Sequence, residues 1–198
     1  GPINGWTSID VFGMLGVAMT CYGVTFGFFH GITELPQFVL RGSFDSVLLA
    51  PVNSFLKLSG SSFSVTAYGD LLIGISVCIF YGFYLHFSFY SWFLFLFSII
   101  LGCIVFICIR LLCSLVAFFI HDSEVVSHQM FEIFLRPGLY PGAIFPNKLK
   151  IFCMTVLPAL ISSAVPVDVV KLNSAQFVLF ALSVTLIWIC ITYFIFKK

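Results

Sequence analysis

The stretch SWFLFLFSIILGCIVFICI, residues 91–109, contains no charged residue and consists almost entirely of large apolar side chains. A helix needs ~20 mainly apolar residues to cross the hydrocarbon core of a bilayer, which is ~30 Å thick. The stretch lacks the strict alternation of apolar and polar residues that the strands of a membrane β-barrel need. It therefore predicts a membrane-spanning helix.

The composition extends this prediction to the whole chain. Of the 198 residues, 61% are hydrophobic and 9% are charged, whereas an ordinary soluble domain is about half apolar and about a quarter charged. So few charges cannot cover a water-facing surface of this size. We therefore predict an all-α fold, a polytopic helical membrane protein that forms a single transmembrane domain over residues 1–198.

Several classes of function find no support in the sequence. The net charge is +1, and no basic cluster offers a site for nucleic acid. A phosphate-binding loop, a GxSxG elbow and a pair of catalytic carboxylates are all missing, so we predict neither ATP hydrolysis nor another enzymatic activity. The seven cysteines form no CxxC pair. We interpret six of them as small apolar side chains, and we predict no metal site and no cofactor.

Five membrane crossings are predicted. The run of residues 90–120 is 31 residues long with Arg110 as its single charge, which as a helix gives ~46 Å, too long for one crossing and too short for two. We place a tight turn near Arg110, because a charge at the bilayer centre costs ~2.5–3.5 kcal/mol. The predicted crossings are residues 9–32, 68–87, 92–109, 111–135 and 175–196.

Residues 137–166 contain prolines at positions 137, 141, 146, 158 and 166. Prolines at this frequency exclude a long regular helix. We therefore expect short broken helices in a re-entrant segment that precedes the last crossing. The alternative, which remains open, makes residues 149–165 the fifth span in place of residues 111–135.

The distribution of Lys and Arg gives the orientation, because cytoplasmic loops carry more of both. The lysine pair at 197–198, together with Arg41 and Lys57, places the C-terminus and residues 34–66 in the cytoplasm. The re-entrant segment is then extracellular. Lys148 and Lys150 are exceptions to the rule in this assignment, and the alternative assignment puts both in the cytoplasm.

Two motifs resemble those of a known family. RGSFDSVLLAPV (residues 41–52) fits the pattern G-x-[LF]-D-x-x-L-x-x-P-[VL], and LYPGAIFPNKL (residues 139–149) fits YP-x-x-IFP-x-x-L. The sequence resembles the permease subunits of bacterial ABC exporters of type 2, the ABC-2 family, over almost its whole length. The matched residues are Gly42, Phe44, Asp45, Leu48, Pro51 and Val52 in the first motif, and Tyr140, Pro141, Ile144, Phe145, Pro146 and Leu149 in the second.

The resemblance implies the permease subunit of an ATP-driven exporter in the bacterial inner (plasma) membrane. A separate ABC ATPase subunit would supply the energy, and a second permease, identical or homologous, would complete the translocation pathway. In the family a further span precedes the position of Gly5-Trp6, so we expect five spans here of six. Without that span, we expect the small-residue pair Gly23 and Gly27 to lack its packing partner. A small structural subunit of a larger membrane complex is the alternative function.

The resemblance also assigns residues 34–66 to a cytoplasmic coupling segment that docks on the ATPase. The candidate coupling residues are Arg41, Gly42, Asp45 and Pro51. The spacing predicts a helix over residues 37–49, with Arg41 and Asp45 as an i,i+4 pair. The alternative is that these two side chains form an ordinary solvated pair.

A second set of ionisable residues lies at helical spacing. His121, Glu124, His128 and Glu132 fall at i, i+3, i+7 and i+11, on one face of a helix. Ionisable groups inside a membrane are functional candidates, so we predict that these residues line the pathway. Without an HExxH-type pattern they are a weak signal for a metal, and the alternative is the polar side of a helix that emerges into water.

Overall fold

Four long helices form the body of the protein. The computed structural model describes residues 5–49, 51, 53–120 and 122–197. Four helices in this part are long and apolar enough to cross a membrane: α1 (Ser8–Phe28), α5 (Val65–Tyr84), α6 (Phe89–Leu115) and α10 (Ala175–Lys197). No strand occurs among the described residues. The predicted all-α polytopic membrane fold is confirmed.

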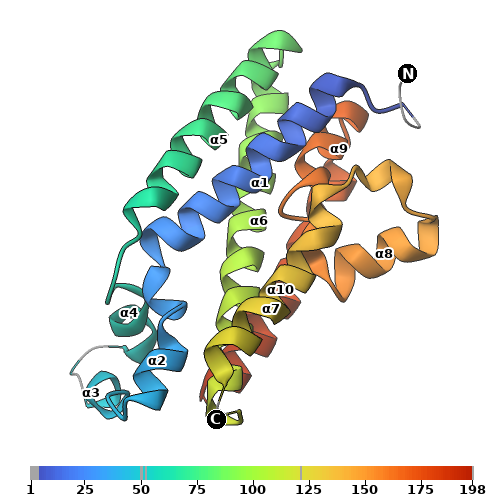
Figure 1. Cartoon of the computed structure of the whole chain (residues 1–198). Coiled ribbons are helices and arrows are strands. Elements are labelled where there is room, and N and C mark those ends of the chain that lie inside the picture. Colours follow the sequence, from blue (N-terminus) through green and yellow to red (C-terminus); the bar gives the residue numbers. More distant parts are fainter. Residues whose placement is uncertain (1–4, 50, 52, 121, 198) are drawn as a thin grey trace.

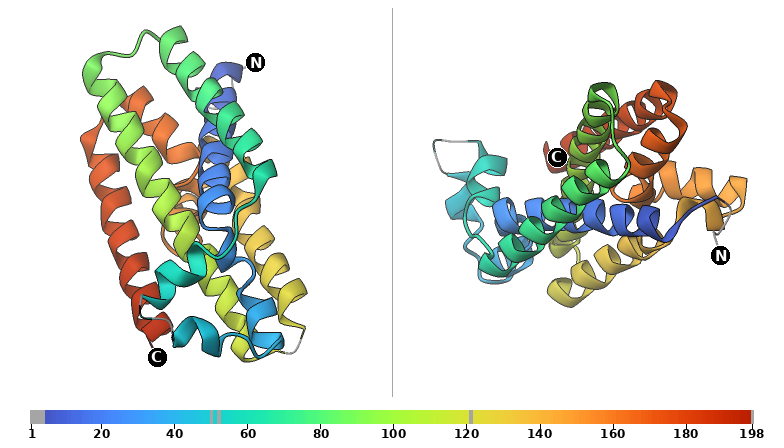
Figure 2. Two further views of the ribbon diagram at one scale, coloured as in Figure 1. Left: turned by 90° about the vertical axis from the view of Figure 1, so that its left-hand side faces the viewer. Right: turned by 90° about the horizontal axis from the view of Figure 1, so that it is seen from above.

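The long helices lie side by side and run from one end of the bundle to the other (Figures 1 and 2). Helix α1 packs along α5, and α10 packs along α6. The start of α1 lies at one end of the bundle, which we call the N-terminal end. The C-terminus lies at the opposite end, which we call the C-terminal end (Figure 1).

The predicted crossings at residues 9–32, 68–87 and 175–196 correspond to α1, α5 and α10, and the crossing at residues 92–109 lies within α6, so these four predictions are confirmed. The predicted turn near Arg110 is wrong, because α6 continues through this residue to Leu115. Arg110 is only 2% exposed, and hydrogen bonds from its guanidinium to other segments satisfy the charge inside the protein. The helix therefore does not need to expose this side chain to water.

Neither candidate for the fifth span is a single helix. Within residues 111–135, α7 (Ser123–Leu135) has 13 residues, a length of ~20 Å. Within residues 149–165, α8 (Asn147–Thr155) stops before Pro158. Both versions of the prediction are wrong in this respect, since each assumed a continuous helix.

The chain instead returns from the C-terminal end to the N-terminal end in pieces, over residues 123–172, which we call the broken return (Figure 1). The predicted breaking of the proline-rich segment is confirmed. Residues 158–169 are all buried, so this stretch of the return lies inside the protein, whereas Leu139, Tyr140 and Ile144 in the earlier irregular stretch are exposed. After α7, its pieces are η3 (Arg136–Leu139), η4 (Gly142–Ile144), α8, η5 (Pro158–Leu160) and α9 (Ala164–Leu172).

Short helices lie across the C-terminal end of the bundle (Figure 2). They are η1 (His30–Ile32), α2 (Leu35–Leu40), α3 (Asp45–Leu48) and α4 (Ser54–Ser59). We call residues 34–59, with the exception of residues 50 and 52, the end platform.

The predicted helix over residues 37–49 is wrong, because the chain turns sharply at Gly42. Gly42 has φ +65°, a left-handed conformation that favours glycine. The amide of Gly42 donates to the carbonyl of Val39 at 3.1 Å, and the amide of Ser43 donates to that of Phe38 at 3.0 Å. This pair of bonds is the Schellman motif that ends many helices.

Glycines bring α1 and α5 into backbone contact. A Cβ added at Gly23 would lie 2.6 Å from the amide nitrogen of Leu71, and one at Gly74 would lie 2.6 Å from that of Thr20. Such close approach is typical of small residues between membrane helices. The expectation that the Gly23 face lacks a packing partner is wrong, because α5 of this chain occupies it.

We predict that Gly23→Ala lowers the free energy of unfolding by about 1–3 kcal/mol, because the added methyl group overpacks a backbone contact. Gly69→Ala is the matched control on α5, where an added Cβ meets nothing within 4 Å. The control should leave stability unchanged or raise it slightly, by up to about 1 kcal/mol, through helix propensity. Thermal unfolding of both variants in detergent measures the difference, and equal midpoints would contradict the proposed contact.

Candidate functional site

The end platform presents the candidate coupling residues on its outer side. Arg41, Gly42, Asp45 and Pro51 are all exposed. Arg41 and Asp45 do not form the expected i,i+4 pair, because α2 ends before Arg41 and α3 begins at Asp45. The two ion pairs in the described part of the chain use other residues. The side chains of Arg41 and Asp45 are therefore available to a partner.

The inner side of the end platform is apolar and packs on the long helices. Val47 belongs to a buried cluster that also contains Leu111 and Leu115 of α6. The ring centroid of Phe44 lies 5.3 Å from that of Phe118, and further contacts reach the end of α10. The platform is thus anchored to two long helices.

Two polar contacts connect the end platform and its junction to α7. Nε2 of Gln37 donates to Oε1 of Glu124 at 3.0 Å. Of the other predicted pathway residues, His128 is exposed and Glu132 is half-buried on the same helix, while His121 lies outside the described residues. The structure places three of the four on α7, and their role in lining a pathway stays a prediction.

Arg110 provides the second contact. Its Nε donates to Oγ1 of Thr33 at 3.2 Å, and its Nη2 donates to the Thr33 carbonyl at 3.5 Å. Its Nη1 donates to the carbonyl of Ser127, on α7, at 3.4 Å. The guanidinium therefore links α6, the junction that leads into the end platform, and α7.

The charge of Arg110 is stabilised without a carboxylate. Neither of the two ion pairs among the described residues involves it. Its guanidinium carbon lies 5.2 Å from the ring centroid of Phe131 and 5.9 Å from that of Phe26. Aromatic faces attract a cation by about 0.5–2 kcal/mol, most strongly when it is desolvated. Neutral acceptors and aromatic rings together hold this buried charge.

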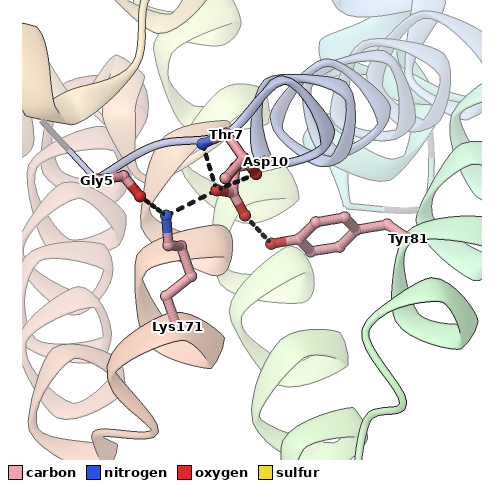
Figure 3. A network of polar contacts seen from close by, with 5 residues as sticks. All are labelled: Gly5, Thr7, Asp10, Tyr81 and Lys171. Carbon is pink, nitrogen blue, oxygen red and sulfur yellow. Dashed lines mark hydrogen bonds and ion pairs between the residues drawn. The ribbon is translucent and has the colours of Figure 1, made fainter. Parts of the chain in front are cut away.

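At the N-terminal end, a polar network surrounds Asp10, which is 3% exposed (Figure 3). Lys171 donates to Oδ2 of Asp10 at 2.7 Å and to the carbonyl of Gly5 at 2.7 Å. The amide and the hydroxyl of Thr7 each donate to the same Oδ2 at 2.8 Å. The Tyr81 hydroxyl donates to Oδ1 at 3.0 Å. The network joins α1, α5 and α9.

A second ion pair holds the broken return together. Lys150 of α8 lies 2.9 Å from Asp168 of α9, and its side chain is 24% exposed. Lys150 thus neutralises a buried carboxylate and is not a free loop charge. The sequence prediction missed both ion pairs. The rule that ionisable residues inside a membrane are functional candidates would have singled out Asp10, in the predicted crossing 9–32, whereas Asp168 lies outside every predicted crossing.

The comparison with known families assigns the chain. A model described as ABC-2 family transporter protein matches residues 1–198. The chain belongs to this family. It is therefore a multi-pass membrane component of an ABC transporter, a permease, as the two sequence motifs predicted. No curated protein and no solved structure matches the chain significantly.

This ABC-2 permease has no apparent metal centre in the described residues, where no three His, Cys, Asp or Glu side chains gather at a ligating distance. Six of its seven cysteines are buried, and all seven are free thiols. Their interpretation as small apolar side chains is confirmed for these six. The candidate site consists of the exposed end platform and the polar contacts that connect it to α7.

We predict that Arg110→Met lowers the free energy of unfolding by about 1–3 kcal/mol, because it removes three hydrogen bonds from a charged donor. Arg110→Lys should also be destabilising, since one ammonium cannot reproduce the planar fork that reaches Thr33 and Ser127. Arg136→Met is the matched control at an exposed position, where we expect a change within about 0.5 kcal/mol. Denaturation in detergent tests the ranking, and an Arg110→Met variant as stable as the control would contradict the linking role.

Proposed function

We propose that this permease is the membrane-spanning subunit of an ATP-driven exporter in the bacterial inner membrane. It forms half of a translocation pathway, and a second permease subunit, identical or homologous, forms the other half. A separate ABC ATPase subunit docks on the end platform. The observation that carries this proposal is the family match over residues 1–198, together with a platform whose candidate coupling residues Arg41, Gly42, Asp45 and Pro51 are exposed while its inner side is anchored.

In the proposed mechanism, ATP-driven closure of the ATPase subunits displaces the end platform. Apolar packing on Leu111 and Leu115 carries this displacement to α6. The contacts of Gln37 with Glu124 and of Arg110 with Ser127 carry it to α7. Because α7 begins the broken return, the inward-facing and outward-facing states would differ in how the return packs. ATP shifts their populations through its different contacts in each state.

The proposed orientation places the C-terminal end of the bundle in the cytoplasm. Arg41, Lys57 and Lys197 lie at this end and are exposed. Lys150 and Lys171, on α8 and α9, are both neutralised by aspartates. Of the five exposed Lys and Arg residues that form no ion pair in the described part of the chain, these three lie at the C-terminal end, and the other two, Arg136 and Lys148, lie on the broken return. This majority supports the proposed orientation, because cytoplasmic surfaces carry more Lys and Arg.

We predict that replacing Arg41 and Asp45 together with alanine reduces substrate-stimulated ATPase activity at least about tenfold, a coupling loss of ~1.4 kcal/mol. The measurement uses the reconstituted transporter in proteoliposomes. Lys148→Ala, an exposed charge on the broken return, is the control and should leave the stimulation unchanged. If the double variant inserts normally and keeps full stimulation, the coupling role of the platform is wrong.

We predict that a membrane-impermeant maleimide added to intact cells labels Lys148→Cys and does not label Lys57→Cys. The native chain gives a low background, because six of its seven thiols are buried. Labelling of Lys57→Cys should require permeabilised membranes. The reverse pattern would invert the proposed orientation.

A further inference from the structure

A cavity opens beside the C-terminal end of α7. Its volume is about 370 Å³, within the range of about 300–1,000 Å³ that is typical of small-molecule sites. Residues of α1, α5, α6, α7 and η3, together with residues 162 and 163, form its walls. The lining includes Leu15, Met19, Tyr22, Asp70, Phe106 and Leu139.

The cavity has an acidic and aromatic character. Asp70 is half-buried on α5, and the two ion pairs among the described residues do not use it. The rings of Tyr22 and Phe106 pack edge to face with centroids 6.4 Å apart. Carboxylates and aromatic faces both attract cations.

The cavity offers little to an anion. None of the described side chains that line it is a lysine, arginine or histidine. Ser162 and Ser163 reach the lining, but their hydroxyls already donate to the carbonyl of Ala159, at 2.8 Å and 3.2 Å. The nearby Arg110 is buried, and its donors are directed to Thr33 and Ser127.

We propose that this cavity binds an amphipathic organic cation, with its apolar body against Leu15, Met19 and Phe106 and its charged centre beside Asp70. An uncompensated carboxylate at membrane depth is costly and is usually kept for a functional partner. The apolar lining matches the body of such a ligand and the carboxylate matches its charge. We further infer that this cation is the exported substrate, and this second step rests on the proposed function. The binding of the cation to the cavity does not.

One wall of the cavity belongs to the broken return. Leu139 and Gly138 come from η3, directly after α7, and Ser162 and Ser163 lie between η5 and α9. A displacement of α7 therefore changes the shape of the cavity. This position suits a site whose affinity differs between the two states of a transporter.

The test uses the full chain in nanodiscs of zwitterionic phosphatidylcholine, without ATP or a partner subunit. Tetraphenylphosphonium is the cationic probe, and tetraphenylborate has a similar shape with the opposite charge. Equilibrium binding of each is measured after subtraction of empty nanodiscs. We expect saturable binding of the phosphonium and none of the borate.

Three variants assign the binding to the cavity. Asp70→Asn should weaken phosphonium binding about tenfold, equivalent to ~1.4 kcal/mol. Asp122→Asn removes an exposed carboxylate outside the cavity and should change affinity less than twofold. Ala18→Phe fills the cavity from α1 and leaves Asp70 in place, so it should abolish binding without a change of charge.

Equal binding of both probes, or an Asp70→Asn variant with unchanged affinity, would overturn the proposal. So would a cavity that holds only phospholipid, detected by native mass spectrometry and not displaced by the phosphonium. The result is separable from the proposed function. Binding that depends on Asp70 without ATP-driven transport would refute the export role alone, whereas normal ATPase coupling without binding would refute the cation site alone.

Discussion

Inside a bilayer, every backbone polar group has to find its hydrogen-bond partner within the protein. In this permease, the requirement is hardest to meet in the broken return. Its prolines interrupt the helical hydrogen bonds, so it cannot face lipid as a regular helix does. The fold encloses the later part of the return, where residues 158–169 are buried. Gly102 lets α6 approach the backbone of residues 161 and 162, where an added Cβ would lie 3.0 Å away. The long helices act as the walls that make an irregular crossing tolerable.

Different kinds of interaction hold the two ends of the broken return. At the N-terminal end, Lys171 neutralises the buried carboxylate of Asp10, and removing the lysine would leave an uncompensated buried charge. At the C-terminal end, Arg110 holds α7 through a single carbonyl contact, at 3.4 Å. A guanidinium can exchange one neutral acceptor for another at lower cost than it can abandon a carboxylate. In the proposed mechanism, α9 is therefore the fixed end of the return and α7 is the end that moves.

Hydropathy predicted a crossing for each of the four long helices, although residues 92–109 cover only part of α6, because each depends on a local property, a continuous apolar run. Proline content predicted the broken segment for the same reason. The sequence could not show that α6 continues through Arg110, since its partners Thr33 and Ser127 are 77 and 17 residues away. The contact between Asp10 and Lys171 spans 161 residues and was equally hidden. The prediction of one helix over residues 37–49 was wrong for a local reason: Gly42 adopts a left-handed conformation and ends α2.

The first sequence motif combines two tasks that the structure separates. Gly42 ends α2 and turns the chain, and a Cβ there would meet nothing within 4 Å, so its requirement is for backbone conformation and not for space. Phe44 and Val47 anchor the inner side, which leaves Arg41 and Asp45 outside. A docking surface transmits a displacement only if its inner side is packed against the element that has to move. The end platform meets this condition at α6 and, through Glu124 and Arg110, at α7. Since η3 continues directly from α7 and forms a wall of the cavity, the proposed coupling surface and the proposed cation site are joined by a short chain of contacts.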